Sequence, residues 1–299
     1  MASSTVVVIP ARFGSTRLPG KALADISGRP MVCHVADRAR RARGIVRVIV
    51  ATDDTRIRDA VTQAGGEAIL TGSQHPTGTD RLAEVARGLE ADVLVNVQGD
   101  LPLLDPTMVE ALAGRMAAEP ALAMATVATP LRDEADWRSP HVVKVVVDAA
   151  DRALYFSRSP IPHDRDGRRP PGEPFGWRHV GMYAYRRDVL LALAALPPSP
   201  LERREQLEQL RALEHGIAIA VVRWPVDSRH DRAGRGCARS RARGRRRRRP
   251  PSPRAASASP PPRAAASPPS PWRARARPSC GPRAPPPWSG RAAADRPGR

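Results

Sequence analysis

Cysteine is scarce in this chain of 299 residues, which contains only Cys33, Cys237 and Cys280. Because Cys33 alone lies before residue 228, that part of the chain can form neither an internal disulfide framework nor a cysteine metal cluster. Such cysteine usage is typical of a reducing compartment. The sequence also lacks an apolar run of about 18 residues, the length of a spanning helix, and a signal-peptide pattern at its start. These absences predict a cytoplasmic protein with no membrane segment.

The last part of the chain lacks aliphatic residues and has few acids. Residues 229–299 contain no Val, Ile, Leu or Met, and they set 20 arginines against two acids, Asp231 and Asp295. Nearly all of the net charge of +19 therefore lies there, and the preceding residues are close to neutral. Such a composition cannot bury enough apolar surface to offset the entropy lost on folding. We therefore predict a folded domain over residues 1–228 and a disordered tail over residues 229–299.

Two explanations fit this tail. A genuine basic extension would bind nucleic acid or an anionic surface through its charge, and nucleic acid is a partner only in that case. Alternatively, the reading frame shifts near Ser228, and residues 229–299 are the out-of-frame translation of a GC-rich gene. The abrupt change of composition and the loss of acids and aliphatic residues favour the second explanation.

Short apolar runs alternate with helix-like segments before the tail. Strands are predicted at residues 6–9, 45–51, 92–97, 122–129, 141–147, 153–156, 179–185 and 217–224. Helices are predicted at residues 31–43, 54–64, 80–89 and 201–214. The alternation in the first half indicates parallel strands covered by helices on both faces, and the second half continues the sheet in mixed order. The fold class is therefore α/β, and ligands should bind beyond the carboxyl ends of the strands.

A loop of small residues follows the first predicted strand. It reads Pro-Ala-Arg-Phe-Gly-Ser-Thr-Arg-Leu-Pro-Gly-Lys over residues 10–21 and carries the cations Arg12, Arg17 and Lys21. Small residues let backbone N–H groups approach phosphate oxygens, arginine binds phosphate in bidentate fashion, and lysine supplies a point charge. The loop matches neither the Walker A pattern nor GxGxxG. It predicts a site for a triphosphate.

A carboxylate follows the predicted strand at 92–97, in the sequence Asn-Val-Gln-Gly-Asp that ends at Asp100. At the ligand edge of the sheet Asp100 could hold Mg²⁺ against substrate phosphates, with the amide of Gln98 beside it. The spacing equally allows Asp100 to cap the following helix. In the polar loop 75–81, Thr79 or Asp80 is the expected cap of the next helix.

A third group of polar residues is predicted to flank the same edge. It comprises Lys144, Arg158 and the run from Arg178 to Tyr185. Together these side chains could receive a substrate that bears a carboxylate. Taken singly, each is more often a packing residue or a structural hydrogen-bonding group.

Eight sequence blocks occur in one order: IPARFGSTRLPGK, ATDD, HPTGTDRLAEV, VNVQGD, VVKVV, ALYFSRSPIP, RHVGMYAY and LExxExLEQLRALEHG. The series resembles the 3-deoxy-manno-octulosonate cytidylyltransferase family over residues 5–225. The resemblance implies a GT-A-like, Rossmann-type nucleotidyltransferase fold and a homodimer. It also implies transfer of a cytidylyl group from CTP to 3-deoxy-D-manno-octulosonate (Kdo), giving CMP-Kdo and diphosphate for lipopolysaccharide biosynthesis. The alternatives are a related acidic sugar, or a degenerate body that acts through a basic nucleic-acid-binding tail.

The resemblance also implies roles for individual residues. Arg12, Lys21 and Asp100 would carry the catalysis, with Mg²⁺ as cofactor on Asp100. The nucleotide would be bound by Ala11, Arg12, Ser15, Arg17, Lys21, Thr79 and Asp80. The sugar would be bound by Gln98, His179, Tyr183, Tyr185 and Glu208.

The sequence departs from the family pattern at two places. The family has Glu-Pro after the aspartate of the Gln-Gly-Asp block, whereas Leu101-Pro102 follows Asp100 here. After its last sheet strand the family has Val-Asp-Thr-Pro-Glu-Asp-Leu, whose first aspartate is a second metal ligand. Here Asp227 is the candidate for that ligand, in a Val-Asp-Ser string directly after the predicted strand.

Overall fold

Strand β1 (Thr5–Ala11) lies at the centre of the parallel part of the sheet. The computed structural model describes residues 4–14 and 19–225. In it β1 pairs in parallel with β4 (Arg47–Thr52) and β6 (Val93–Asn96), and β4 pairs in parallel with β5 (Glu67–Leu70). The β-branched residues of β1, β4 and β6 are almost fully buried, as in a parallel sheet covered on both faces.

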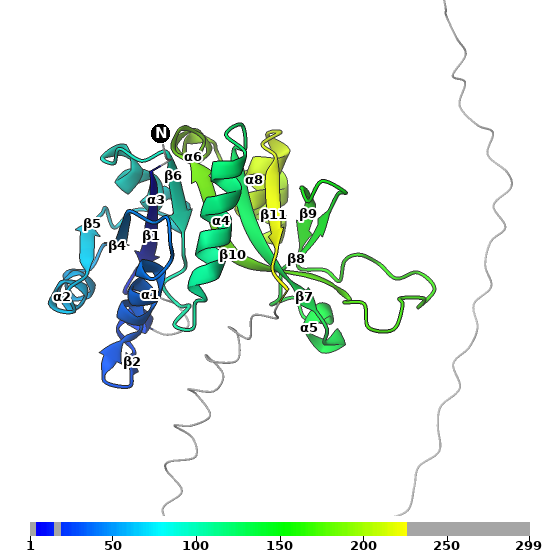
Figure 1. Ribbon diagram of the computed structural model, residues 1–299, viewed down its shortest axis with the longest axis horizontal. Coiled ribbons are helices and arrows are strands. Elements are labelled where there is room, and N and C mark those ends of the chain that lie inside the picture. Colours follow the sequence, from blue (N-terminus) through cyan, green and yellow to red (C-terminus); the bar gives the residue numbers. More distant parts are fainter. Residues whose placement is uncertain (1–3, 15–18, 226–299) are drawn as a thin grey trace, which may run out of the picture. The chain divides into compact units, whose positions relative to one another are not determined.

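Helices cover both faces of this sheet, because successive side chains of a strand point to opposite sides. Val7 and Ile9 pack in one core with α1 (Met31–Arg40), α2 (Thr55–Gln63) and α4 (Pro106–Ala118). Val6 and Val8 pack in a second core with α3 (Gly78–Arg87) and α6 (Arg187–Ala195). Figure 1 shows α1 and α4 in front of the strands and α6 behind them.

The second half continues the sheet with antiparallel pairs. Strand β10 (Gly176–Arg186) lies between β6 and β7 (Met124–Leu131) and is antiparallel to both, and β11 (Ile219–Arg223) pairs in parallel with β7. A hairpin of β8 (Lys144–Val147) and β9 (Ala153–Ser157) joins β10 through β8. The main path is β11-β7-β10-β6-β1-β4-β5 in a nine-stranded sheet. Remaining elements are the 3-10 helix η1 (Lys21–Leu23), β2 (Asp25–Ile26), β3 (Arg29–Pro30) and α5 (Glu134–Arg138).

The predicted α/β class with a mixed, mainly parallel sheet is confirmed. The predicted single helix over 201–214 is wrong, because the structure has two short helices, α7 (Pro200–Glu205) and α8 (Gln209–Glu214). Gln206 adopts a left-handed conformation between them, with φ of 55°. Periodicity did not reveal this break, since the guanidinium of Arg158, remote in sequence, binds the carbonyls of Glu205 and Gln206.

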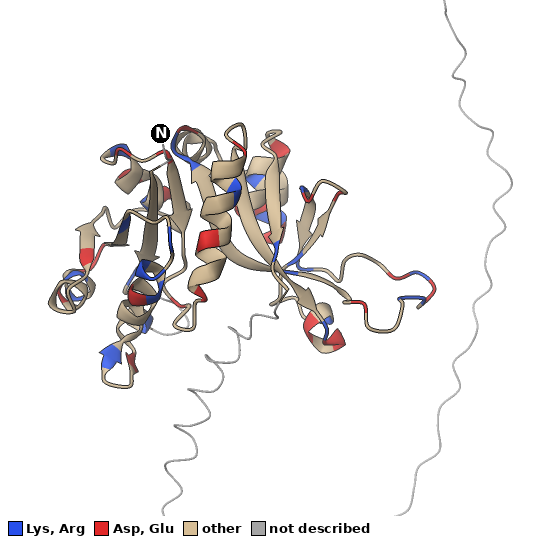
Figure 2. Ribbon diagram, viewed as in Figure 1, with Lys and Arg blue, Asp and Glu red and all other residues tan. Residues whose placement is uncertain are grey.

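Charged residues of both signs are interspersed over the described elements (Figure 2), in keeping with a nearly neutral body. Within residues 4–14 and 19–225, no helix has the length and apolar character needed to cross a membrane. The predicted tail, residues 229–299, lies outside the described residues, and so the boundary at residue 228 stays a prediction.

Candidate active site

The predicted ligand edge of the sheet is formed by the carboxyl ends of β1, β4 and β6. Parallel pairing of β1 with both neighbours brings Ala11, Thr52 and the segment after Asn96 to the same edge. Gly99 lies close against β1, since a Cβ at this position would be 3.1 Å from the carbonyl oxygen of Pro10. The phosphate loop and the Gln-Gly-Asp segment are therefore neighbours in space, as the sequence predicted.

Lys21 and Asp100 form an ion pair at this edge, with 2.5 Å between Nζ and Oδ2. Both side chains remain partly open to solvent, at 39% and 47% exposure. The alternative role of Asp100 as a helix cap is wrong, because α4 begins at Pro106 and its cap is Asp105, which accepts a hydrogen bond from the Thr107 N–H. Asp100 is thus free of any helix and turned toward the cationic loop.

The base of the loop is closed by backbone geometry. Gly20 has φ of 69°, and its N–H donates to the carbonyl of Phe13 at 2.9 Å. The guanidinium of Arg56 stacks 3.5 Å from the Phe13 ring centroid. This closure brings Lys21 back toward β1. Ser15 and Arg17, predicted to bind the nucleotide, lie outside the described residues, as does the candidate metal ligand Asp227.

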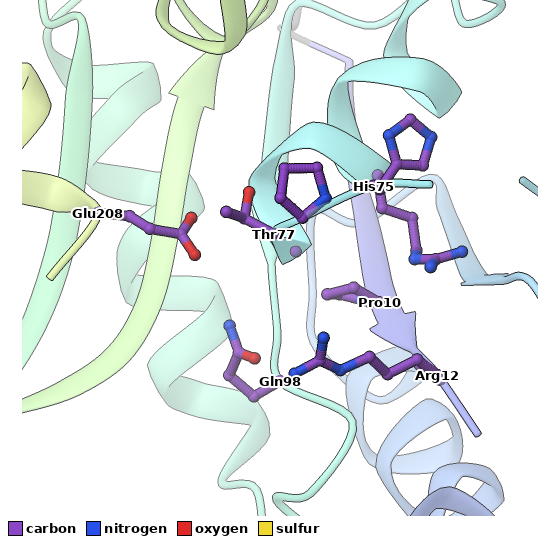
Figure 3. A pocket seen from close by; sticks show the side chains of 10 residues that line it. Pro10, Arg12, His75, Thr77, Gln98 and Glu208 are labelled. Carbon is purple, nitrogen blue, oxygen red and sulfur yellow. The ribbon is translucent and has the colours of Figure 1, made fainter. Parts of the chain in front are cut away.

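A cavity of about 240 Å³ opens beside the loop, and we call it the Arg12 cavity. It is lined by Pro10, Ala11, Arg12, His75, Pro76, Thr77, Gly78, Arg81, Gln98 and Glu208. Figure 3 shows Gln98 and Glu208 on one side of this cavity and His75 and Arg12 on the other. Residues from β1 and from the 75–81 loop thus surround one space.

A buried ion pair and a histidine–carboxylate hydrogen bond hold the 75–81 segment in place. Arg81 is 3% exposed and donates to Asp53 at 3.0 Å. His75 hydrogen-bonds Glu84 through Nε2, which lowers the pKa of the Glu84 carboxyl, and Glu84 also accepts from the Gly72 N–H. Sequence reasoning assigned His75, Arg81 and Asp53 no role, although all three lie in the blocks that carry the family resemblance.

The prediction that Thr79 or Asp80 caps α3 is wrong. Thr77 is the cap and accepts from the Asp80 N–H, while the Thr77 hydroxyl donates to the Asp80 carboxylate at 2.7 Å. Thr79 lies in the first turn of the helix instead and donates to Glu208 at 2.6 Å. Thr79 therefore connects the nucleotide side of the site with the residue predicted to bind the sugar.

A second cavity, of about 390 Å³, contains all five predicted sugar-binding residues in its wall, and we call it the His179 cavity. These residues are Gln98, His179, Tyr183, Tyr185 and Glu208. Gln98 and Glu208 line both cavities, so the two cavities adjoin. The structure therefore brings together residues from β10, from the end of β6 and from the α7–α8 turn.

Burial in the His179 cavity favours the neutral forms of several residues in its wall. Burial lowers the pKa of His179 to about 3 and raises the pKa values of Tyr183 and Tyr185 above their ordinary range. Glu208 is exposed as a residue, yet its carboxyl lies where protein atoms displace water, and this desolvation raises its pKa. The wall thus combines neutral hydrogen-bonding groups with one carboxyl and with the guanidinium groups of Arg158 and Arg211.

Two further wall residues were missed by sequence reasoning. Oδ1 of Asn96 and Nε2 of Gln209 are buried and have no hydrogen-bond partner within the described residues. The residues themselves are 2% and 5% exposed. Unpaired buried polar atoms are costly unless a ligand or water satisfies them. Asn96 could have been found from the sequence, because it is an amide inside an otherwise apolar strand.

Lys144 and Arg158 differ from the expectation that they receive a substrate carboxylate. Lys144 is completely buried and donates to the carbonyls of Ser139 and Val142, and burial lowers its pKa to about 8. Arg158 does line the His179 cavity, but its guanidinium donates to backbone carbonyls, including that of Glu205 at 2.8 Å. Both cations therefore act first as structural groups.

The residues at the edge fit a magnesium ion that is held chiefly by substrate phosphates. Within the described part of the chain, no cluster of three or more His, Cys, Asp or Glu side chains could hold a metal by itself. Asp100 offers one accessible carboxylate next to the phosphate loop, and Mg²⁺ in phosphate sites commonly takes one or two carboxylates. Asp100 therefore suits a magnesium ion that substrate phosphates also bind. The described residues do not suit a metal ion that is bound by protein side chains alone.

The cationic loop, the single carboxylate and the two adjoining cavities at the carboxyl edge of an α/β sheet define a nucleotidyltransferase site. The chain belongs to the cytidylyltransferase family, whose model, described as "Cytidylyltransferase", matches residues 6–219.

Curated relatives and a solved structure agree with this family. The chain is 52% identical to a 3-deoxy-manno-octulosonate cytidylyltransferase of Trichlorobacter lovleyi, over 75% of this chain and 91% of that protein. It is 51% identical to the protein of the same name from Geobacter sulfurreducens, over 74% and 91%. A solved CMP:2-keto-3-deoxy-manno-octonic acid synthetase in complex with CTP matches with a TM-score of 0.74 and 45% identity, over 81% of this chain and 99% of that one. The family predicted from the eight sequence blocks is therefore confirmed.

Proposed function

We propose that this protein transfers a cytidylyl group from CTP to Kdo, forming CMP-Kdo and diphosphate for lipopolysaccharide biosynthesis. The observation that carries the proposal is the shared wall of the two cavities. The Arg12 cavity and the His179 cavity meet at Gln98 and Glu208. A nucleotide in the first and a sugar in the second would therefore have their reacting ends next to each other.

The reaction makes modest chemical demands on the protein. The anomeric hydroxyl of the sugar attacks the α-phosphorus of CTP, and diphosphate leaves. Positioning and charge neutralisation supply the catalysis, and no covalent nucleophile is required. The described residues of the site accordingly include hydrogen-bonding groups and cations at the carboxyl edge of the sheet.

Arg12 and Lys21 are proposed to bind the triphosphate, together with Arg17 and Ser15. Arg12 is exposed at the mouth of its cavity, where a guanidinium can bind phosphate oxygens in bidentate fashion. The backbone of Ala11 and Arg12 would contact the cytosine. Thr79 and Asp80 belong to the proposed nucleotide side as well, although Thr79 binds Glu208.

We propose that Asp100 binds Mg²⁺ as cofactor, with Asp227 as the candidate for a second ligand. When bound there, the ion would lower the pKa of the attacking hydroxyl and neutralise phosphate charge. Lys21 and Asp100 form an ion pair with each other. Binding of the metal to Asp100 would therefore break this pair, and Lys21 would then be available to bind the phosphates. Gln98, His179, Tyr183, Tyr185 and Glu208 are proposed to hold the sugar.

Diphosphate release tests the proposed function. Purified protein would be given CTP and Mg²⁺ with Kdo, with an amino-Kdo and with a sialic acid, each in parallel. Turnover with Kdo at the highest kcat/KM supports the proposal, and a higher kcat/KM with another acidic sugar reassigns the substrate. An Asp100→Asn variant serves as the inactive control. We also propose that the protein is a homodimer and that it is cytoplasmic. Light scattering would test the first property, and fractionation of cells would test the second.

A further inference from the structure

Thr126 is a fully buried residue of β7 that the sequence analysis did not single out. Its hydroxyl oxygen lies 2.6 Å from the carbonyl oxygen of Met182 and 3.0 Å from Nε2 of His179. Both partners belong to β10, and the register between β7 and β10 shifts between His179 and Tyr183. The Thr126 side chain therefore spans an irregularity in the strand that carries the sugar-binding residues.

The hydroxyl of Thr126 has one proton to donate. A carbonyl oxygen can only accept, so the 2.6 Å approach to Met182 requires that this proton point at the carbonyl. The Thr126 oxygen is then left as an acceptor toward His179. Nε2 of His179 must therefore carry a hydrogen and donate it to Thr126. The tautomer is thus assigned from the hydrogen-bond network.

The imidazole of His179 is neutral in this environment. The ring of Phe156 meets it edge-on at 5.0 Å between centroids, and the ring of Tyr183 lies at 5.2 Å. Burial among these groups lowers the pKa of His179 far below neutral pH. A neutral imidazole with its hydrogen on Nε2 has a lone pair on Nδ1. No described residue is recorded as a hydrogen-bond partner of Nδ1, and His179 lines the cavity.

We propose that Thr126 is a positioning residue that fixes His179 as a hydrogen-bond acceptor for a hydroxyl group of the sugar substrate. An acceptor on Nδ1 attracts an O–H donor and repels a carboxylate oxygen. Thr126 therefore determines which part of an acidic sugar can lie against β10: a hydroxyl-bearing part, with the carboxylate elsewhere. The unpaired Oδ1 of Asn96, on the neighbouring strand β6, adds a second acceptor to the same wall. The hydrogen on Nε2 follows from the Thr126 hydrogen bonds, the lone pair on Nδ1 also requires the burial that keeps the ring neutral, and the role toward the sugar rests on the proposed function.

Nitrogen-15 NMR of the full chain labelled at histidine tests the tautomer directly. Protonated and unprotonated ring nitrogens give well-separated signals, and the His179→Gln variant identifies the His179 signals among those of the seven histidines. We expect one neutral species with the hydrogen on Nε2. A wild-type chain with the hydrogen on Nδ1, or with a charged imidazolium at neutral pH, would overturn the assignment.

Steady-state kinetics test the role of Thr126. Thr126→Val keeps the shape of the side chain and removes its hydrogen bonds, whereas Thr126→Ser keeps the hydroxyl. We expect Thr126→Val to raise the KM for the acidic sugar by about five- to tenfold, the effect of losing one neutral hydrogen bond, with little change in the KM for CTP. In Thr126→Val the imidazole of His179 should show both tautomers and faster exchange of the ring proton. Thr126→Ser should restore the wild-type values.

Control variants and separate readouts keep the outcomes distinct. Thr5→Val changes another buried threonine of a strand. Thr5 lies at the amino end of β1, whereas the site lies at the carboxyl end, so this variant should leave the KM values for CTP and for the sugar unchanged. An unchanged sugar KM in a folded Thr126→Val chain would refute the positioning role. Absence of turnover with every acidic sugar would refute the proposed function, and the NMR spectrum would still decide the tautomer.

Discussion

The ammonium of Lys21 lies 2.5 Å from Oδ2 of Asp100, so this lysine of the phosphate loop neutralises the proposed metal ligand before any substrate binds. The pair connects the end of the loop after β1 with the segment after β6. A cation that enters this edge must therefore compete with Lys21 for the carboxylate. Binding of the metal to Asp100 therefore releases Lys21 to bind phosphate, and we call this replacement of Lys21 by the metal the exchange.

Removal of Lys21 should consequently separate metal affinity from activity. In Lys21→Met, Asp100 loses its counterion, and Mn²⁺ should bind the CTP-free protein roughly two- to fivefold more tightly, the size of an exposed ion pair. Turnover should fall by about 100-fold or more, since a phosphate-binding cation is lost. Electron paramagnetic resonance of free Mn²⁺ measures the first effect. Lys21→Arg is the matched control, and weaker Mn²⁺ binding in Lys21→Met would contradict the exchange.

The ion pair of Arg211 and Glu202 should dominate the stability of the α7–α8 region. The two side chains are 7% and 9% exposed and joined by two hydrogen bonds, of 2.8 and 2.6 Å. Arg211→Met leaves the Glu202 carboxylate buried without its partner, which should lower the free energy of unfolding by about 3–5 kcal/mol. Urea unfolding measures the change. The double variant with Glu202→Met should lose less than the single one, and an equal or larger loss would contradict this account.

The stability contributed by Lys144 should depend on alkaline pH. Its pKa is lowered from an ordinary value of 10.5 to about 8 by burial. Between those values the unfolded chain keeps a proton that the folded chain has released, so raising the pH favours the folded state. The free energy of unfolding of the wild type, relative to Lys144→Met, should therefore rise from about pH 8 to pH 10. Urea titrations of both chains across this range measure it, and a falling difference would contradict the shift.

The reading-frame explanation of residues 229–299 is tested at the gene. Sequencing of the locus should reveal, in an alternative frame after the codon for Ser228, a string similar to Val-Asp-Thr-Pro followed by a helix-like segment. A frame-corrected chain should then respond to lower Mg²⁺ concentrations than the present one, because it regains a second carboxylate for the metal. Salt-dependent DNA binding that is lost on truncation at Ser228 would instead support a genuine basic extension.

The sequence predicted the site best where a strand and the charged residue that follows it belong to one short segment of the chain. The loop to Lys21 and the segment to Asp100 each follow a Val-rich strand, and parallel strands end at one edge by necessity. The roles of Thr126 and Gln206 escaped prediction for a different reason. Thr126 depends on an irregular register with β10, and the break at Gln206 depends on the guanidinium of Arg158. Both are products of contacts between distant segments, which no local periodicity encodes.

The position of β10 has a consequence for synthesis of the protein on the ribosome. Because β10 lies between β6 and β7, those two earlier strands cannot be joined in the sheet until residues 176–186 have left the exit tunnel. The His179 cavity must therefore form late in translation, whereas the pairing of β1 with β4 and β6 is available early. The sheet closes with β11, which ends at Arg223. A nascent chain that has passed this residue contains all nine strands of the sheet in the described part of the chain, and a translational error further downstream changes the sequence of none of them.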